Sequence, residues 1–243
     1  MRIARRPSKF VLWRFLEPDL RGIDGAVGVD AACATFKTYP LFHTASYYGV
    51  DLDLAAIRQG RREHPEAIGL VGDLTELDLP EASVDVCVST NTFHWIRPDQ
   101  RRAALERLAR LVRADGWLLV EGPADFCDES VGWLRGCFDD VDVRYFGNPL
   151  SCAYERWLEK RAYVERGRGL FAALRVAVAA FLGAGELLLQ RSRRGKRWAY
   201  IRCHRRRDAQ PAAAFQIDES RRIEDGIYTA SARADAGQVS YTL

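Results

Sequence analysis

Four polar residues in the first half of the chain follow short apolar runs, and their types suit a ligand rich in hydrogen-bond donors. They are Asp30, Asp51, Asp73 and Asn91. In an open α/β sheet, ligands bind beyond the carboxyl ends of the strands, so these side chains are expected at one edge. A carboxylate only accepts hydrogen bonds and can therefore hold ribose hydroxyls or an adenine amino group. Asp51 ends the second run, which is the usual ribose-binding place in nucleotide-binding sheets.

Short apolar runs alternate with amphipathic stretches over this region, which predicts a parallel sheet covered by helices on both faces. The expected strands are residues 26–29, 46–50, 67–71, 83–89 and 117–121, and the expected helices are residues 54–63 and 101–113. Asp115 and Gly116 predict a turn before the fifth strand. Further along, the pattern predicts a helix at 131–138, a strand at 141–146, a long helical stretch at 155–190 and a last strand at 198–203.

Five stretches of this region resemble the class I S-adenosylmethionine (SAM) dependent methyltransferases, specifically the methyltransferase type 11 group. They occur in the order and spacing of that family across residues 22–122, about half the chain. The stretches are residues 27–34 (VGVDAACA), 48–51 (YGVD), 72–74 (GDL) with Leu79 and Pro80, 84–89 (VDVCVS) and 111–119 (LVRADGWLL). The resemblance implies an α/β, Rossmann-like, doubly wound and mostly parallel seven-stranded sheet, with a helical insertion before the last strand.

The same resemblance implies a SAM site and assigns residues to it. Asp30 and the following loop, with Ala32 and Ala34, would lie near the methionine part of SAM. Asp51, followed by Leu52, would hold the ribose. Asp73 and Leu74 would lie at the adenine, and Asn91 would face the reacting methyl group. No metal site is implied.

The loop after the first strand departs from the family pattern. The family reads acidic-x-Gly-x-Gly-x-Gly, and this chain has Ala32, Ala34 and Phe36 at the three glycine positions. Glycine serves such loops through positive φ angles and close approach of the backbone to a ligand. Asp51 and Asp73 also have a structural alternative as helix N-caps. Asp85, inside the fourth strand, is interpreted as structural.

A histidine follows the fourth strand and is the candidate catalytic base. His94 lies one helical turn past that strand, and histidine suits proton removal from an oxygen acceptor near neutral pH. The alternative is a surface or supporting histidine. Residues 89–93 (STNTF) lack the Asn/Asp-Pro-Pro-aromatic motif of base amino methylation, which disfavours nucleic acid as the substrate.

Charge is unevenly distributed along a chain whose net charge is only +3. Residues 25–149 contain twelve basic and twenty acidic groups, a net charge of −8, whereas residues 150–210 contain fifteen and five, a net charge of +10. Basic segments favour nucleic acid, anionic lipid or anionic substrates.

The basic segment contains an apolar helix, residues 170–189, in which Arg175 and Glu186 share one stripe. Basic residues flank it on both sides (Arg161, Arg166 and Arg168 before; Arg191, Arg193, Arg194, Lys196 and Arg197 after). Three interpretations stay open: a lid or dimer helix, a helix in the interface of an anionic membrane, and a membrane span.

Five regions are expected. They are an N-terminal helical segment (1–24), a SAM-binding Rossmann-like core (25–149), a helical insertion (150–197), a last sheet strand (198–207) and a weakly patterned, irregular or partly ordered tail (208–243). The six cysteines form no C-x-x-C motif, which favours a cytoplasmic protein, with peripheral attachment to the inner face of the membrane as one alternative.

The sequence thus predicts a SAM-dependent methyltransferase acting on a small-molecule or lipid-linked acceptor, at oxygen. Two alternatives remain. One is a methyltransferase-like binding or scaffold protein that has lost catalysis, and the other is an RNA methyltransferase that uses the basic segment. A homodimer and an anionic membrane surface are the candidate partners.

Overall fold

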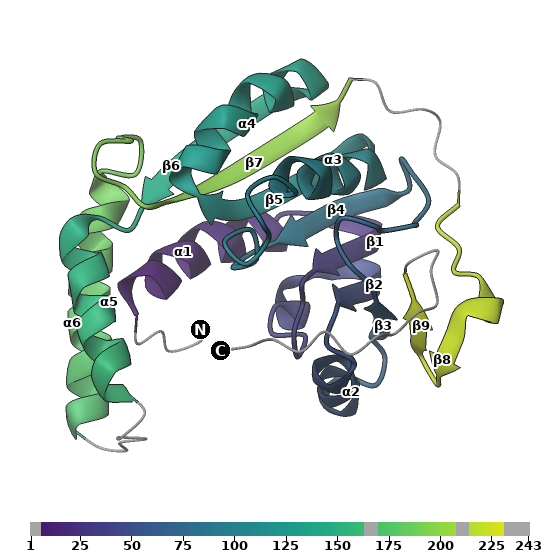
Figure 1. The fold of residues 1–243 in the computed structure, drawn as a ribbon, viewed down its shortest axis with the longest axis horizontal. Helices are drawn as coiled ribbons and strands as arrows, with labels where there is room; N and C mark the ends of the chain where they lie inside the picture. Colours follow the sequence, from purple (N-terminus) through teal and green to yellow (C-terminus); the bar gives the residue numbers. More distant parts are fainter. Residues whose placement is uncertain (1–5, 163–169, 208–213, 231–243) are drawn as a thin grey trace.

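The computed structural model describes residues 6–162, 170–207 and 214–230. Its centre is one nine-stranded sheet in the order β6-β7-β5-β4-β1-β2-β3-β9-β8 (Figure 1). The strands are β1 (Asp24–Ala31), β2 (His43–Asp51), β3 (Ile68–Val71), β4 (Val84–Ser89), β5 (Val112–Pro123), β6 (Phe138–Phe146), β7 (Trp198–Arg206), β8 (Arg222–Glu224) and β9 (Ile227–Thr229). The helices are α1 (Pro7–Arg21), α2 (Leu54–Glu63), α3 (Arg101–Leu111), α4 (Ala124–Cys137), α5 (Pro149–Ala162) and α6 (Leu170–Leu188), with 3₁₀ turns at Tyr39–Leu41 and Glu219–Arg221.

Seven of these strands form the predicted sheet. Strands β1 to β5 are parallel, and β7 pairs antiparallel with both β5 and β6. The mostly parallel Rossmann-like architecture, with a helical insertion before the last of the seven strands, is therefore confirmed. The turn predicted at Asp115 and Gly116 is wrong in detail, because both residues lie within β5. The pairing register of β5 against β4 shifts at this point, because Val84 pairs with Val112 whereas Val86 pairs with Trp117. The additional β5 residues between these two pairs form an irregularity in the strand.

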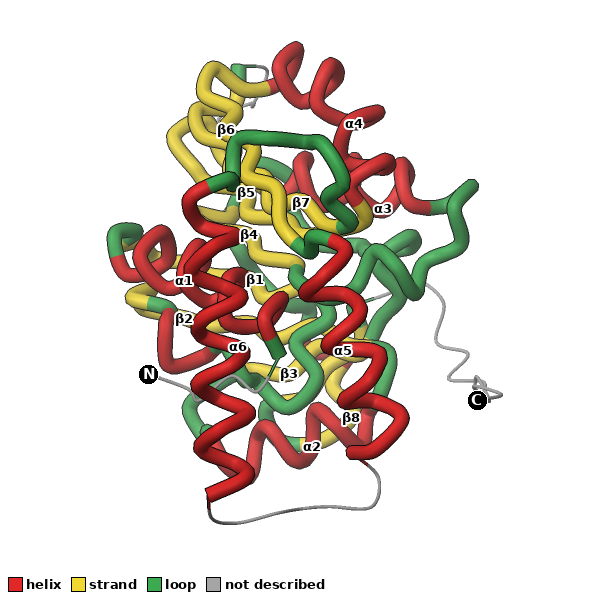
Figure 2. Tube along the Cα trace, turned by 90° about the vertical axis from the view of Figure 1, so that its left-hand side faces the viewer, coloured by secondary structure: helices red, strands yellow, loops and turns green. Residues whose placement is uncertain are grey.

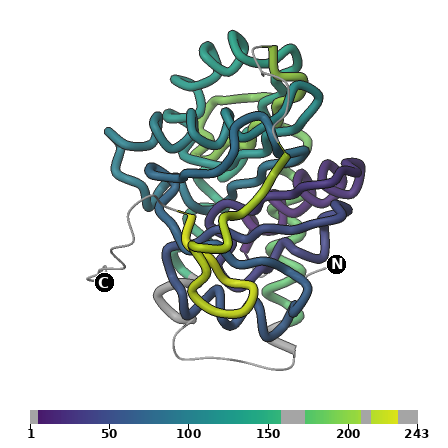
Figure 3. Tube along the Cα trace, turned by 90° about the vertical axis from the view of Figure 1, so that its right-hand side faces the viewer, coloured from purple at the N-terminus to yellow at the C-terminus, as the bar shows by residue number. Residues whose placement is uncertain are grey.

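Two further strands come from the segment expected to be irregular. Strand β9 pairs parallel with β3, and β8 pairs antiparallel with β9, which extends the sheet at its β3 edge (Figure 3). Ion pairs between Arg58 and Glu224 and between Arg221 and Asp78 fix this extension to the core. Residues 208–213 and 231–243 of the expected tail lie outside the described residues.

Both faces of the sheet are covered, as the alternation of apolar side chains along the strands requires. Cys87, Leu118 and Val120 pack in one cluster with α3 and α4, whereas Val88 and Leu119 pack in another with α1. The core therefore consists of two apolar layers on either side of the central strands.

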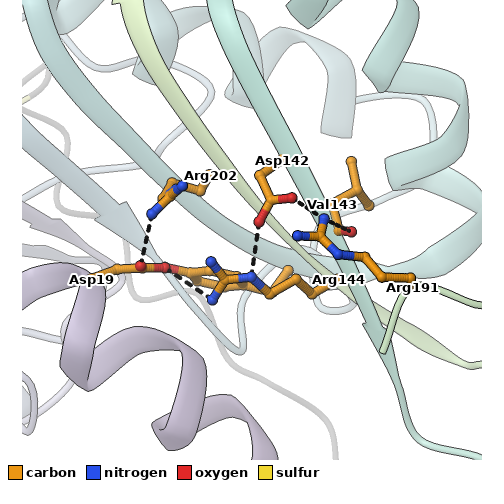
Figure 4. Close-up of polar contacts among 7 residues, drawn as sticks. Asp19, Asp142, Val143, Arg144, Arg191 and Arg202 are labelled. Carbon is orange, nitrogen blue, oxygen red and sulfur yellow. Dashed lines mark hydrogen bonds and ion pairs between the residues drawn. The ribbon is translucent and has the colours of Figure 1, made fainter. Parts of the chain in front are cut away.

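Helix α1 is fixed to the antiparallel end of the sheet by a buried carboxylate. Asp19 accepts hydrogen bonds from Arg144 at 3.4 Å and from Arg202 at 3.1 Å, and Arg144 in turn bonds Asp142 at 2.8 Å (Figure 4). Arg191 also pairs with Asp142. This network holds α1 so that its N-terminus reaches the carboxyl ends of the central strands.

Helices α5 and α6 lie side by side across that end of the molecule (Figures 1 and 2). The single helical stretch predicted at 155–190 is two helices, and the side chains of Arg161, Arg166 and Arg168 lie outside the described residues. One face of α6 packs on α1, where Phe10 lies against Gly183. Glu186 is buried and pairs with buried Lys196 at 2.5 Å. In the described part of the chain, no helix is long and apolar enough to cross a bilayer.

Candidate functional site

The loop after β1 keeps the backbone of a glycine loop although it contains no glycine. Ala32, Ala34 and Phe36 have φ angles of 63°, 49° and 54°. This left-handed region costs a non-glycine residue about 1–2 kcal/mol, so the surrounding structure must impose it. The three positions where the family has glycine are the three that adopt glycine-like angles.

The Phe36 side chain packs beneath the loop. Its ring is fully buried and lies edge-to-face against Tyr47, with ring centroids 5.5 Å apart. Gly49 and Gly60 make this placement feasible, because a Cβ atom at Gly60 would lie only 2.7 Å from Phe36 Cγ and one at Gly49 would also overlap the ring. The large side chain therefore fills a space between β2 and α2 and leaves the loop backbone uncovered by its ring.

Asp30 lies under the same loop, almost inaccessible to solvent. Its Oδ2 accepts hydrogen bonds from the Thr38 hydroxyl and, at 2.8 Å, from the Tyr47 hydroxyl. Burial raises the pKa of Asp30 to about 6, although these two hydrogen bonds oppose the rise. The observed contacts of Asp30 hold the loop to β2, and its assignment as a cofactor ligand stays a prediction.

Asp51 lies directly beside the loop. Its Oδ2 accepts the Ala34 N–H at 2.8 Å and its Oδ1 accepts the Asp53 N–H at 2.9 Å. The N-cap of α2 is Asp53, which accepts from Ala55 and Ala56 at 2.8 and 3.2 Å, so the capping alternative does not apply to Asp51. A carboxylate has about four acceptor positions, which leaves Asp51 able to accept from a ligand.

The remaining predicted cofactor residues have mixed environments. Leu52, next to Asp51, is an exposed leucine. Asp73 uses Oδ1 to accept from the N–H and hydroxyl of Thr75, both at 2.8 Å, and Leu74 is buried in the core. The structure thus brings the loop and Asp51 together, while Asp73 is engaged in its own turn after β3. Asp85 is structural as interpreted, because it accepts from Ala26 and Val27 and pairs with Arg113.

A cavity of about 280 Å³ lies at the carboxyl ends of β4 and β5, between the N-terminus of α1 and α5. Asn91 and His94 line it, together with Lys9, Glu121, Arg156 and Arg197, of which only Arg197 stands out in the sequence, as one of the basic residues that flank the apolar helix. Within the described residues, no group of three or more His, Cys, Asp or Glu side chains could hold a metal ion.

Asn91 joins three elements at this cavity. Its Oδ1 accepts from Lys9 Nζ at 2.6 Å, and its N–H donates to Glu121 Oε2 at 2.5 Å. Burial raises the pKa of Glu121, while the Asn91 N–H and Lys9 oppose the rise. Burial also lowers the pKa of Lys9. Glu121 lies near the end of β5 as Asp30 and Asp51 lie near the ends of β1 and β2, so the search for polar residues at strand ends could have found it in the sequence.

His94 is half-buried between two indole rings, Trp95 and Trp198, at centroid distances of 4.9 and 5.3 Å. Its buried Nδ1 has no hydrogen-bond partner in the described part of the structure. Burial, then the charges of Lys9, Arg101 and Arg197, lower its pKa to about 4. The imidazole is therefore neutral at neutral pH and free to accept a proton, but it is a weaker base than an unperturbed histidine.

This environment predicts how His94 titrates. In an NMR titration its imidazole is expected to change protonation near pH 4 instead of 6.5. The folded state then binds this proton less tightly than the unfolded chain, so the stabilisation is present above pH 6.5 and is lost as the pH falls towards 4. Lys9→Met should raise the pKa by removing a nearby charge, while the exposed Lys37→Met should leave it unchanged. A His94 pKa at or above 6.5 would contradict this account.

Comparison with known proteins agrees with this geometry. Residues 24–120 match the model of a family described as "Methyltransferase domain". No curated protein sequence matches the chain.

Three solved structures share the fold at low sequence identity. The cyclase SpnF is 13% identical, with 80% of this chain and 81% of that chain covered and a TM-score of 0.54. A TehB-like SAM-dependent methyltransferase from Corynebacterium glutamicum is 18% identical, with 82% and 88% covered and a TM-score of 0.50. Geranyl diphosphate C-methyltransferase from Streptomyces coelicolor is 12% identical, with 81% and 80% covered and a TM-score of 0.50.

Proposed function

We propose that the chain is a class I, SAM-dependent methyltransferase that methylates a small-molecule or lipid-linked acceptor, at oxygen, because residues 24–120 match the family described as "Methyltransferase domain". One observation carries the proposal. The loop with glycine-like φ angles is bonded to Asp51 at the end of β2, while a cavity with two proton acceptors, His94 and Glu121, opens at the ends of β4 and β5. The loop proposed to hold the cofactor and the cavity proposed to hold the acceptor would thus both lie at the carboxyl-end edge of the sheet.

The residues present fit SAM. The backbone of Ala32 and Ala34 would lie near its methionine part, with Asp30 holding the loop from below. Asp51 would accept both ribose hydroxyls, and the exposed Leu52 would offer an apolar surface to the adenosine. Asp73 and Leu74 would lie at the adenine, and Asn91 would lie nearest the methyl group. The inward packing of Phe36 supports this fit, because its ring does not fill the cradle.

SAM, when bound, supplies a methyl group on a sulfonium sulfur. The chain's own residues position the acceptor and receive its proton. Lys9 and Asn91, bonded to each other, line the cavity, and the buried Glu121 carboxylate or the neutral His94 imidazole accepts the proton of an acceptor hydroxyl. Burial favours proton uptake by Glu121, whose pKa it raises, and opposes proton uptake by His94, whose pKa it lowers.

The direct test is calorimetry of the full chain with SAM and with S-adenosylhomocysteine. Binding of either is the expected result. Absence of binding by both would remove the enzyme proposal in favour of the binding or scaffold alternative. The loop geometry favours the enzyme over that alternative, because non-glycine residues with strained backbone angles cluster at ligand-binding sites.

The RNA alternative depends on free cations in the last basic run, and most of these arginines are engaged. The ion pairs are Arg191 with Asp142, Arg193 with both Asp125 and Asp128, Arg202 with Asp19, Arg205 with Asp140, and Arg207 with Asp139. Such a neutralised surface is a poor phosphate patch. The same pairing weakens the membrane alternative, because Arg191 and Arg193 were expected to reach lipid head groups.

The exposed face of α6 supports a homodimer. Leu174, Phe181 and Leu188 are exposed at a spacing of seven residues, and exposed Ala177 and Ala184 lie between them. Large and small apolar residues alternating at this spacing are typical of a helix that pairs closely with another helix. We infer that α6 of a second copy covers this face, since a two-fold axis presents the same stripe on both sides.

Phe181→Glu is expected to abolish this pairing, because it would bury a charge in an apolar seam. Sedimentation velocity should show a monomer at concentrations where the wild-type chain is a dimer. Ala103→Glu, which adds the same charge on exposed α3, is the control and should remain a dimer. A wild-type monomer that co-sediments with anionic liposomes through this stripe would assign the face to the membrane instead.

A further inference from the structure

We infer that the cavity at the ends of β4 and β5 takes an acceptor bearing an anionic group, a carboxylate or a phosphate, which Arg156 and Arg197 hold at its rim. The inference rests on the proposed function, because it names the class of acceptor for the same site. It follows from the charges that line the cavity and from which of them already have partners.

The acidic side chains of the cavity are engaged by backbone donors. Glu121 accepts the Asn91 N–H at 2.5 Å, and Glu155 accepts the Ser8 N–H at 2.6 Å. Lys9 is bonded to Asn91 at 2.6 Å. These lining groups are therefore bonded within the protein and are oriented before any acceptor enters.

The two rim arginines differ from the other arginines of the basic segment. In the described part of the chain, no carboxylate forms an ion pair with Arg156 or Arg197, whereas the arginines just before and after Arg197 in the sequence are mostly paired with aspartates. Both arginines are exposed, and both line the cavity. Two uncompensated guanidinium groups at the mouth of one cavity are a site for an anion.

Local contacts hold both guanidinium groups near the cavity. Arg197 lies over the Trp198 ring at 5.2 Å, and that ring also contacts His94, the candidate base. Arg156 donates from Nε to the Cys152 carbonyl at 3.4 Å, one helical turn earlier on α5. The charge of Arg197 is close enough to contribute to the lowered pKa of His94. The anion-binding rim and the proton acceptor therefore belong to one site.

The size of the cavity limits the acceptor. The volume of about 280 Å³ is just below the usual range for small-molecule sites, roughly 300–1,000 Å³. A small hydroxylated acid or phosphate fits this volume, and a lipid fits only if its head group enters while its tails stay outside. The small acid or phosphate and the lipid head group carry the same anionic chemistry, and the experiment below distinguishes between them.

The test compares matched neutral and anionic probes by titration calorimetry. The full chain is titrated with 4-hydroxybenzoate, 4-hydroxybenzamide and phenyl phosphate, each with and without S-adenosylhomocysteine. The anionic probes are expected to bind about fivefold more tightly than the amide. That preference should disappear in an Arg156→Gln and Arg197→Gln double variant that binds S-adenosylhomocysteine as the wild type does.

Arg194→Gln is the matched control, because Arg194 is exposed, is close in sequence and does not line the cavity. It should keep the preference for anions. In a second arm, vesicles of phosphatidylglycerol and phosphatidylcholine replace the soluble probes, and vesicle binding that depends on the two arginines identifies a lipid head group as the anion.

Equal binding of the acid and the amide, or a preference that survives the double variant, would overturn the inference. Failure to bind S-adenosylhomocysteine would instead count against the proposed function, and the titrations without it would still decide the preference for anions. The two failures are therefore distinguishable.

Discussion

Asp51→Ala is expected to weaken the binding of S-adenosylhomocysteine at least tenfold, about 1.4 kcal/mol. The substitution removes the carboxylate proposed to accept from the ribose hydroxyls, and charge-assisted hydrogen bonds of this kind are strong. It also removes the acceptor of the Ala34 N–H, which releases one attachment of the loop. Titration calorimetry of the folded variant measures the loss.

Asp53→Asn is the control for this prediction. Asp53 is two residues away and caps α2, and asparagine is as good an N-cap as aspartate. Its affinity for S-adenosylhomocysteine should stay within about twofold of the wild-type value. If Asp51→Ala bound the ligand as tightly as this control, the ribose role of Asp51 would be refuted, and the resemblance would hold for the fold alone.

Lys196→Met is expected to lower the free energy of unfolding by about 3–5 kcal/mol, because it leaves the buried Glu186 carboxylate without its cation. The side chains of Lys196 and Glu186 are 3% and 1% exposed. Glu186 also accepts the Asn148 N–H at 2.8 Å, so the pair connects α6, the start of α5 and the segment before β7. Urea unfolding monitored by circular dichroism measures the effect.

Two variants make this prediction specific. The double substitution Glu186→Leu with Lys196→Met should recover part of the loss, since it leaves no unpaired buried charge, although the Asn148 N–H loses its acceptor. Arg191→Met breaks an exposed pair with Asp142 and should cost less than about 1 kcal/mol. A Lys196→Met variant as stable as Arg191→Met would mean that α6 is not held to the core by this pair.

The environment of Glu186 shows how the tertiary structure reversed one expectation. The sequence shows an apolar helix with one narrow charged stripe, and such a helix is expected to bury its apolar surface. In the structure the Glu186 end of that stripe faces the protein and pairs with Lys196, while Leu174, Phe181 and Leu188 face outwards. The partner of Glu186 is ten residues away, and no periodicity within the helix could identify it.

The first loop illustrates the same limit at the candidate site. The sequence marks Ala32, Ala34 and Phe36 as departures from a glycine pattern, and the altered loop leaves cofactor binding open. The structure keeps the glycine-like angles, because Gly49 in β2 and Gly60 in α2 leave room for the Phe36 ring. The compensation is made by residues distant in sequence, so it becomes visible only once β2 and α2 are packed against the loop.

The sequence alone predicts the succession of the seven main strands along the chain, the aspartates at or just after the ends of β1, β2 and β3, and a resemblance to the class I methyltransferases. These features are local, because alternation of apolar residues and the residue that ends a strand are written within a few neighbouring positions. The remaining features depend on tertiary contacts. Strand β9 forms against β3 and strand β8 forms against β9, with three residues each. Lys9, Glu121, Arg156 and Arg197 meet around one cavity, and most of the basic residues described after α6 pair with acidic side chains. Each of these depends on partners far apart in the chain, and local pattern does not encode which distant surfaces come into contact.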